Sequence, residues 1–302
     1  MQELPRDPVI VNPFDVEGEW LKANLHTHTT VSDGSVPPQE RIGQYAREGY
    51  RVLALTDHNA VVDVDALDPM GMILIRGVET TAQTADKFAY YHIVNLNVPQ
   101  DFNPKNQNTI EEQIKLTTDA GGMVILGHPY WCGLTIREME PVRGIVAFEV
   151  ENSTCRNIGK GTSSVHWDDM LAAGRMLPAV AVDDVHGDRD LYGAWTMLKA
   201  KSPDLAGAIE AIRTGCYYAS CGPVIQYVGL RDGKLLIECS PAREIRIMSR
   251  HSTGRWVKAD CCDSLTRYEC EPRGDWPYVR IEIVDAQGRR AWTNPLIMPK
   301  KG

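Results

Sequence analysis

The sequence contains no run of lysine or arginine, and its formal net charge is −8. Proteins that bind nucleic-acid polymers carry basic stripes for the phosphate backbone, so we expect no such polymer as a partner. The chain also lacks an apolar run long enough to cross a bilayer, and residues 1–20 show no basic stretch followed by an apolar one. We therefore expect no signal peptide, no membrane partner and a cytoplasmic protein.

Cysteine pairs with the CxxC spacing are also missing. Without that spacing or a secretory context, reduced thiols are the expected state of a cytoplasmic chain. A zinc site among the C-terminal cysteines is the less favoured alternative, because the spacing does not fit a zinc knuckle. The eight cysteines are Cys132, Cys155, Cys216, Cys221, Cys239, Cys261, Cys262 and Cys270.

The length of 302 residues allows one large α/β domain, or a barrel with a small appendage, and 43% hydrophobic residues can form an ordinary core. The first two-thirds of the chain alternates strand-like and helical patterns. One helical pattern, residues 202–215, has Ser202 at the N-cap and Pro203 at the first helical position. The alternation implies parallel strands, and polar residues at the strand ends favour a (β/α) barrel over an open doubly wound sheet. The predicted strands cover residues 21–28, 50–58, 72–79, 89–98, 122–129, 144–152 and 176–187.

From about Gly222 the pattern changes to short alternating strands without a convincing helix. Residues 227–239 predict a hairpin, because Asp232-Gly233 is a favoured two-residue turn. We therefore divide the chain into an α/β barrel over residues 1–221 and a small antiparallel β module over residues 222–302.

Six of the eight histidines lie in or at the ends of strand-like runs, beside a carboxylate or another histidine. His26 and His28 are two residues apart, so a strand would point both imidazoles the same way. Imidazole and carboxylate together suit zinc, manganese or iron, and more ligands than one ion can use indicate a multinuclear hydrolytic site. The nine candidate ligands are His26, His28, Asp33, His58, Glu79, His92, His128, Asp184 and His186, whereas His166 and His251 are left out.

Some of these assignments compete with structural roles. His92 stands in mid-strand, where a core histidine is the alternative, and Asp33 lies in a Ser-Asp-Gly turn, which is common turn chemistry. Asp57 is adjacent to His58 and is expected to support the site or cap a loop. Asp183 would point to the face opposite Asp184, so the D-x-H spacing favours Asp184 as the ligand.

The ordered series HTHTTVSDG, TDHN, GVE, a further histidine, GHP and DDVHG, within residues 20–220, resembles the PHP (polymerase and histidinol phosphatase) superfamily. The string AWTNPL at residues 291–296 resembles the tail of the branch known as CehA/McbA-type metallohydrolases. The resemblance implies an irregular (β/α)7 barrel that holds two to three divalent metal ions.

The resemblance also implies three groups of ligands, with Glu79 as a bridge between the first and the second. Many members of the superfamily have histidine where this chain has Asp33, and the Ser-Asp-Gly form is typical of a phosphoesterase-like branch. The implied groups are His26, His28, Glu79 and Asp184 for a first ion, Glu79, His92 and His128 for a second, and Asp33, His58 and His186 for a third.

Residues and resemblance together predict a metal-dependent hydrolase, first of all a phosphoesterase for a small, anionic phosphorylated substrate. A water between two cations loses its proton near neutral pH and can attack phosphorus, while the cations stabilise the developing charge. Two alternatives stay open: hydrolysis of carboxylic or carbamic esters or amides on the same metals, and a metal-binding module without catalysis. We assign catalysis to Glu79, Asp184 and His186, and substrate contacts to Arg156, Lys160 and Arg189 in loops after the strands.

Overall fold

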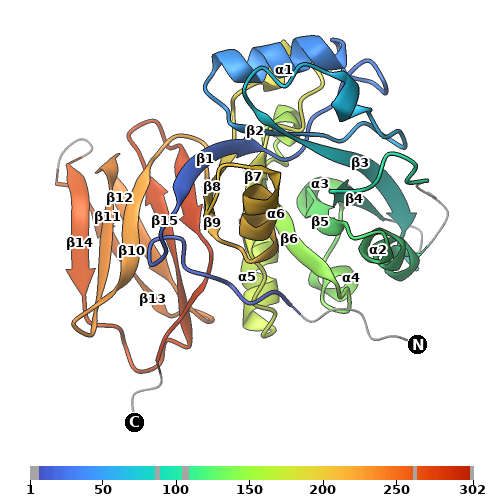
Figure 1. Cartoon of the computed structure of the whole chain (residues 1–302). Coiled ribbons are helices and arrows are strands. Elements are labelled where there is room, and N and C mark those ends of the chain that lie inside the picture. The colour runs from blue at the N-terminus through green and yellow to red at the C-terminus, as the bar shows by residue number, and fades with distance from the viewer. Residues whose placement is uncertain (1–6, 86–88, 104–108, 261–263, 300–302) are drawn as a thin grey trace.

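The computed structural model describes residues 7–85, 89–103, 109–260 and 264–299. Seven strands from the first two-thirds of the chain lie side by side in chain order (Figure 1). Each overlaps a run predicted as a strand, so the α/β class with a large sheet is confirmed. The strands are β1 (Glu19–Asn24), β2 (Val52–Leu55), β3 (Ile73–Gln83), β4 (Tyr90–Leu96), β5 (Met123–Gly127), β6 (Ile145–Asn152) and β7 (Ala179–Val182).

The expectation of uniformly parallel strands is wrong at β4. This strand pairs antiparallel with both β3 and β5, whereas β1–β2, β2–β3, β5–β6 and β6–β7 are parallel pairs. Only residues 84–89 connect β3 to β4. A parallel crossover needs a dozen or more residues, so this short connection forces the reversal.

The two outer strands of this group of seven approach each other at their carboxyl ends. An isolated parallel bridge joins Thr27, after β1, to Val185, after β7. The backbone N–H of Asp184 donates to the oxygen of His26 at 3.0 Å, and that of His28 donates to Val185 at 3.1 Å. The carboxyl ends of the strands are therefore brought around one centre.

The side chains of Thr109, Thr135 and Asp204 cap three of the helices. The helix predicted at 202–215 begins at Leu205, so Pro203 is not its first residue. Asp204, and not Ser202, caps the helix predicted at 202–215: its carboxylate accepts from the N–H of Gly207 at 2.8 Å, while the Ser202 hydroxyl donates to Asp204. Among the described residues, no helix combines the length and hydropathy that a membrane crossing requires. The helices are α1 (Pro38–Arg47), α2 (Ile110–Asp119), α3 (Pro129–Cys132), α4 (Ile136–Met139), α5 (Ser164–Ala172) and α6 (Leu205–Arg213), with 3-10 turns at Val64–Ala66, Thr154–Ile158 and Asp188–Asp190.

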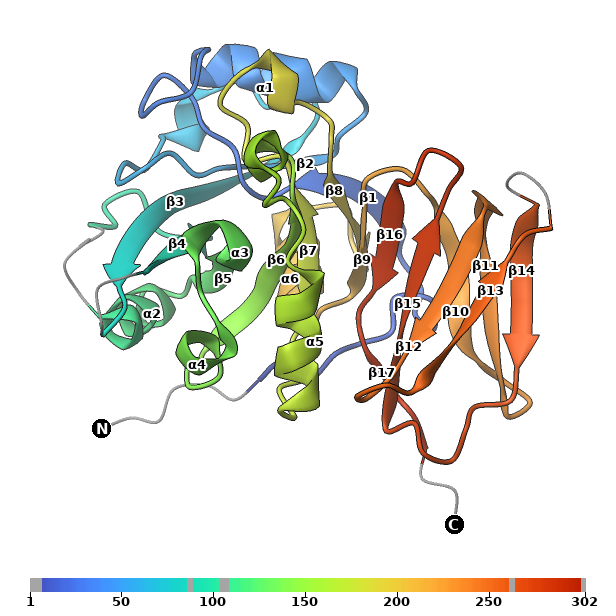
Figure 2. The ribbon, with the colours of Figure 1, turned by 180° about the vertical axis from the view of Figure 1, so that it is seen from behind.

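The C-terminal part is the expected β module, and it continues the main sheet (Figure 2). On the other side of β1, the sheet runs through β8 (Trp195–Ala200), β9 (Tyr217–Ser220), β16 (Arg290–Thr293), β15 (Tyr278–Val284), β12 (Glu244–Met248) and β13 (Gly254–Lys258), with β17 (Leu296–Ile297) paired to β15. A second sheet contains β10 (Ile225–Arg231), β11 (Lys234–Ala242) and β14 (Leu265–Cys270). The predicted hairpin turn is confirmed, since Asp232 and Gly233 have φ of 49° and 77° between paired Arg231 and Lys234.

Asn294, from the AWTNPL string, fastens the module to the α/β part. Its amide donates to the carbonyls of Gly215 at 2.8 Å and Tyr217 at 3.2 Å, and its oxygen accepts from the N–H of Ala179 at 2.9 Å. The boundary between residues 221 and 222 stays a prediction, because β9 and β16 pair across it.

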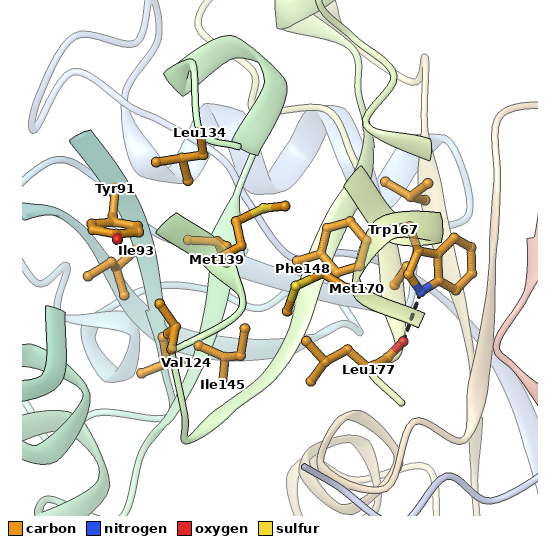
Figure 3. Packing of buried hydrophobic residues seen from close by; sticks show 14 of the residues in the cluster. Tyr91, Ile93, Val124, Leu134, Met139, Ile145, Phe148, Trp167, Met170 and Leu177 are labelled. Atoms are coloured by element: carbon orange, nitrogen blue, oxygen red, sulfur yellow. Dashed lines mark hydrogen bonds between the residues drawn. The ribbon is translucent and has the colours of Figure 1, made fainter. Parts of the chain in front are cut away.

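One apolar core cluster supports the strands that carry part of the site (Figure 3). Ile93, Val124 and Phe148, from β4, β5 and β6, pack with Met139 and Trp167 of the covering helices. The Trp167 indole N–H is buried and donates to the carbonyl of Leu177 at 2.9 Å. This packing holds β4, β5 and β6 in fixed positions, which matters because His92 and Glu149 lie on two of them.

Candidate metal centre

The predicted ligands come from seven places along the chain and meet at the carboxyl ends of the strands. His92 joins them because β4 is reversed: its amino end lies beside the carboxyl ends of β3 and β5. In this register His92 pairs with Thr81 and Gly127, directly beside His128. His58, after β2, forms an isolated bridge with Glu79.

Glu79 is the centre of the cluster and is 1% exposed. Its Oε2 lies 3.1 Å from His26 Nε2, 3.2 Å from His28 Nε2 and 3.2 Å from His58 Nδ1. Its Oε1 lies 2.6 Å from His92 Nδ1 and 3.4 Å from His128 Nε2. One carboxylate thus faces five imidazoles, three through one oxygen and two through the other, as a bridging ligand would.

Asp184 completes a fully buried group of four. Its Oδ1 lies 3.2 Å from His26 Nε2 and 3.0 Å from His28 Nε2. A backbone φ of 52° turns Asp184 out of the strand direction and into the cluster. The ligand atoms of His26, His28, Glu79 and Asp184 all lie within 4.8 Å of one another.

Asp33 lies at the open side of the cluster, where its side chain is 53% exposed. Its oxygens are 3.5 Å from His28 Nδ1, 3.6 Å from His58 Nε2 and 3.4 Å from His186 Nε2. His186 is oriented by its own backbone neighbour, because its Nδ1 donates to the carbonyl of Asp184 at 2.8 Å. The structure therefore brings together all nine predicted side chains, including the three of the proposed third group.

Several buried ligand atoms of the cluster lack a hydrogen-bond partner and would be satisfied by a bound cation. Glu79 Oε1, His92 Nδ1 and Asp184 Oδ1 are buried and have no hydrogen-bond partner among the described residues, although other ligand atoms are near them. Buried polar atoms without partners are costly, and convergent nitrogen and oxygen donors of this kind bind divalent metals. The donor set therefore fits divalent metal ions.

Opposite charges shift the pKa values within the cluster. Burial disfavours the charged ring of His26, but the carboxylates of Asp184 and Glu79 outweigh burial and raise its pKa well above the usual range. The same balance raises the pKa of His28 to about 9. Burial also opposes ionisation of Glu79, yet the imidazoles, His26 first, hold its pKa well below the usual range. A cation and protons would compete for these nitrogens.

Glu149, on β6, is a site residue that the sequence does not single out. Its Oε1 accepts from His26 Nδ1 at 2.7 Å. Its Oε2 accepts from the backbone N–H of His128 and from the amide of Asn152, both at 2.9 Å. The Asn152 amide also donates to Asp184 Oδ2 at 3.0 Å. Glu149 thereby fixes the His26 tautomer that leaves Nε2 free to face Glu79.

The two neighbouring aspartates act outside the cluster. Asp57 is buried and accepts four hydrogen bonds of 2.8–3.0 Å from Thr29 and Ser32, in the loop that carries Asp33. Asp183 points away from the histidines and accepts from the Tyr45 hydroxyl at 2.7 Å. The expectation that Asp57 supports a loop is confirmed.

No protein-family model matches the chain. It is 34% identical over 96 residues to a 5′-3′ exoribonuclease of Haemophilus influenzae. The aligned segment covers 30% of this chain and 34% of that protein. It is 30% identical over 81 residues to a phosphoribosyl 1,2-cyclic phosphate 1,2-diphosphodiesterase of Eggerthella lenta. That aligned segment covers 26% of this chain and 31% of the relative. The matches span about a third of each curated relative.

A crystal structure from Bacteroides vulgatus, of a two-domain protein containing a predicted PHP-like metal-dependent phosphoesterase, superposes with a TM-score of 0.54 at 17% identity. The superposition covers 98% of this chain and 100% of that chain. The two chains share a fold.

The three predicted substrate cations lie in different surroundings. Arg189 lines the cavity over the cluster and its side chain is 77% exposed. Arg156 donates to Glu151 at 2.5 Å and lines another groove, beside the β module. Lys160 lies with its Nζ 5.4 Å from the ring centroid of Tyr130. Of these three cations, Arg189 alone lines the cavity.

The two remaining histidines lie apart from the cluster, whereas Cys132 lies near His92 and His128 and Cys155 lines the cavity. A ring nitrogen of His166 lies 3.0 Å from the carbonyl of Leu134, as a structural histidine would. His251 lies in the turn between β12 and β13. Cys132 has its Sγ 3.4 Å from His128 Nδ1, on the ring edge away from Glu79. The six described cysteines are free thiols, and Cys261 and Cys262 lie outside the described residues.

Proposed function

We propose that this protein is a metal-dependent phosphoesterase of the PHP superfamily. The observation that carries the proposal is the cluster of nine histidine and carboxylate side chains, in which five imidazoles face the two oxygens of Glu79. The shared fold with a protein that contains a predicted PHP-like phosphoesterase supports it, as do the two partial relatives named for phosphoester cleavage.

The finer parts of the proposal rest on the sequence motifs. They are an irregular (β/α)7 barrel, two to three ions of manganese, zinc or iron, and a cytoplasmic location. The AWTNPL string at residues 291–296 supports placement in the CehA/McbA-like branch. Asn294 gives this string a physical role, since it ties the β module to the α/β part.

In this proposal each side chain has a defined task. Glu79 and Asp184 would hold the ions, which when bound would acidify a water and polarise a phosphoryl oxygen. His186, fixed through Nδ1, presents Nε2 to the cavity for holding an ion or moving a proton. Arg189 would bind the substrate anion from the rim. The cavity of about 370 Å³ suits a small phosphorylated molecule.

The first experiment is phosphate release from a panel of phosphomonoesters and diesters by manganese-reconstituted protein. We expect release by the wild type and a loss of several orders of magnitude in Glu79→Gln, because the amide cannot bridge two cations. Glu151→Gln, a change of the same chemistry on a buried glutamate paired with Arg156, is the control and should keep wild-type turnover.

Wild-type turnover in Glu79→Gln, with metal content measured on the same sample, would contradict the proposal. Absence of release from protein that holds its metals would favour carboxylic or carbamic ester or amide hydrolysis, to be assayed with aryl esters and carbamates. A metal-loaded protein inactive on both panels would point to a non-catalytic metal module.

A further inference from the structure

The walls of the cavity over the metal centre differ in chemistry from side to side. Asp33, His186 and Arg189 form a polar side, near the end of β7. Trp131, in α3 after β5, lies beside His92 and His128 and is the only large apolar side chain among the described residues that line the cavity. A substrate therefore meets one charged wall and one aromatic wall.

Trp131 is fixed by the same stretch of chain that carries His128. His128 has φ of 20° and immediately precedes α3, and its carbonyl accepts from the N–H of Trp131 at 3.0 Å. The ring centroid of Trp131 lies 5.2 Å from that of His128 and 5.5 Å from that of His92. Both imidazoles face Glu79 Oε1, so a group lying on the indole would be separated from the metal centre by about the width of one imidazole ring.

Tyr90 packs beside Trp131, although it does not itself line the cavity. Its ring centroid lies 6.0 Å from that of Trp131 and 5.2 Å from that of His92, and its side chain is 36% exposed. Trp131 itself is half-buried. Apolar ring surface beside a polar cavity is covered most favourably by another flat, apolar group, because stacking adds to the area removed from water.

We propose that Trp131, with Tyr90 beside it, is a stacking surface that selects substrates with a planar aromatic ring next to the phosphate. The ring would lie on the indole while the phosphate meets the metal centre and Arg189. Aryl phosphates carry such a ring directly on the phosphate oxygen, and nucleoside monophosphates carry one at the other end of the ribose. The inference rests on the proposed function for the phosphate, but the stacking surface can be tested without turnover.

The test is calorimetric binding of phenylphosphonate and methylphosphonate to metal-reconstituted protein, since their P–C bond resists hydrolysis. We expect phenylphosphonate to bind the wild type at least about fivefold more tightly, the lower end of stacking effects. Trp131→Leu should reduce this preference to within about twofold, whereas Trp131→Phe should retain most of it.

Tyr130→Leu is the matched control. Tyr130 precedes Trp131 in the same helix and is 40% exposed, but its ring lies against His166 at 5.6 Å and does not line the cavity. This variant should keep the wild-type preference. Thermal unfolding of each variant shows that it is folded. Equal affinity of the wild type for the two phosphonates, or binding of neither, overturns the proposal.

Turnover of phenyl phosphate, adenosine 5′-monophosphate and glycerol 3-phosphate then separates the sources of the ring. Trp131→Leu should raise KM for the ring-bearing substrates and leave glycerol 3-phosphate within about twofold. A ring preference in binding without any phosphate release supports the stacking surface and rejects the phosphoesterase. Phosphate release without a ring preference does the reverse.

Discussion

Glu149 controls two ligands of the proposed centre without facing Glu79 itself. Both of its oxygens accept hydrogen bonds, one from His26 and the other from the His128 backbone and Asn152. In Glu149→Gln one of these oxygens becomes an NH2 group, which cannot accept. Loss of such a supporting carboxylate should lower metal affinity by about 10- to 100-fold.

The measurement is metal retained after dialysis against a graded chelator. Glu151→Gln, two residues along the same strand and also buried, should retain wild-type metal because its carboxylate binds Arg156 and Thr162. Equal metal loss in both variants would contradict a specific role for Glu149.

The raised pKa values of His26, His28 and His128 make metal binding a proton-releasing reaction. With a pKa of about 9, His28 carries a proton at pH 7.5, and a cation can bind only when that proton leaves. Metal affinity should therefore fall as pH is lowered. Calorimetric metal titration in buffers of different ionisation enthalpy should show net proton release at pH 7.5.

His166 is the control for this measurement. It forms its contact with Leu134 outside the cluster, so His166→Gln should release as many protons as the wild type. A binding enthalpy that is independent of the buffer would show that the nitrogens are already deprotonated.

At the scale of elements, the loop after β1 depends on a carboxylate from the end of β2. Asp57→Asn replaces one of the two accepting oxygens that hold Thr29 and Ser32, which should cost about 1–3 kcal/mol and release Asp33 from its position. We expect fewer ions bound per chain. Asp63→Asn, an exposed cap of the next turn, should change neither metal content nor stability by more than about 0.5 kcal/mol.

The elements also differ in how well the sequence alone predicts their positions and directions. Several ligands were predictable because a histidine or carboxylate follows an apolar run, as at His58 and His128. The end of β3 was not, since the strand continues past Glu79 to Gln83. The reversal of β4 was not, because a hydrophobic period shows a strand without its direction, although the short 84–89 connection contained the signal. Glu149 was missed because Glu151, two residues later, would point the same way in a regular strand. A register shift between the two separates them, so that Glu149 contacts His26 and Glu151 contacts Arg156.

At the scale of the whole molecule, the β module and the α/β part unfold together if their junction is as well bonded as Asn294 indicates. Asn294→Ala leaves the buried Ala179 N–H and the carbonyls of Gly215 and Tyr217 without their side-chain partner. We expect a loss of about 3 kcal/mol or more in the free energy of unfolding. Denaturant unfolding followed by tryptophan fluorescence measures it.

Gln100→Ala supplies the comparison, since this exposed amide makes one long contact of 3.4 Å to the carbonyl of Val61. Its unfolding free energy should stay within about 0.5 kcal/mol of the wild type. A similar small loss in Asn294→Ala would mean that the AWTNPL string has no role in joining the two parts.

The segment after β1 pairs with the segment after β7, and the ribosome makes these two segments at different times. His26 leaves the ribosome about 160 residues before His186. At about 5–20 residues per second this is a delay of roughly 8–32 s, during which the first ligands exist without the last. The complete ligand set is therefore a late product of synthesis. An ion held at the proposed centre would then be selected by the metal available at that time as well as by affinity.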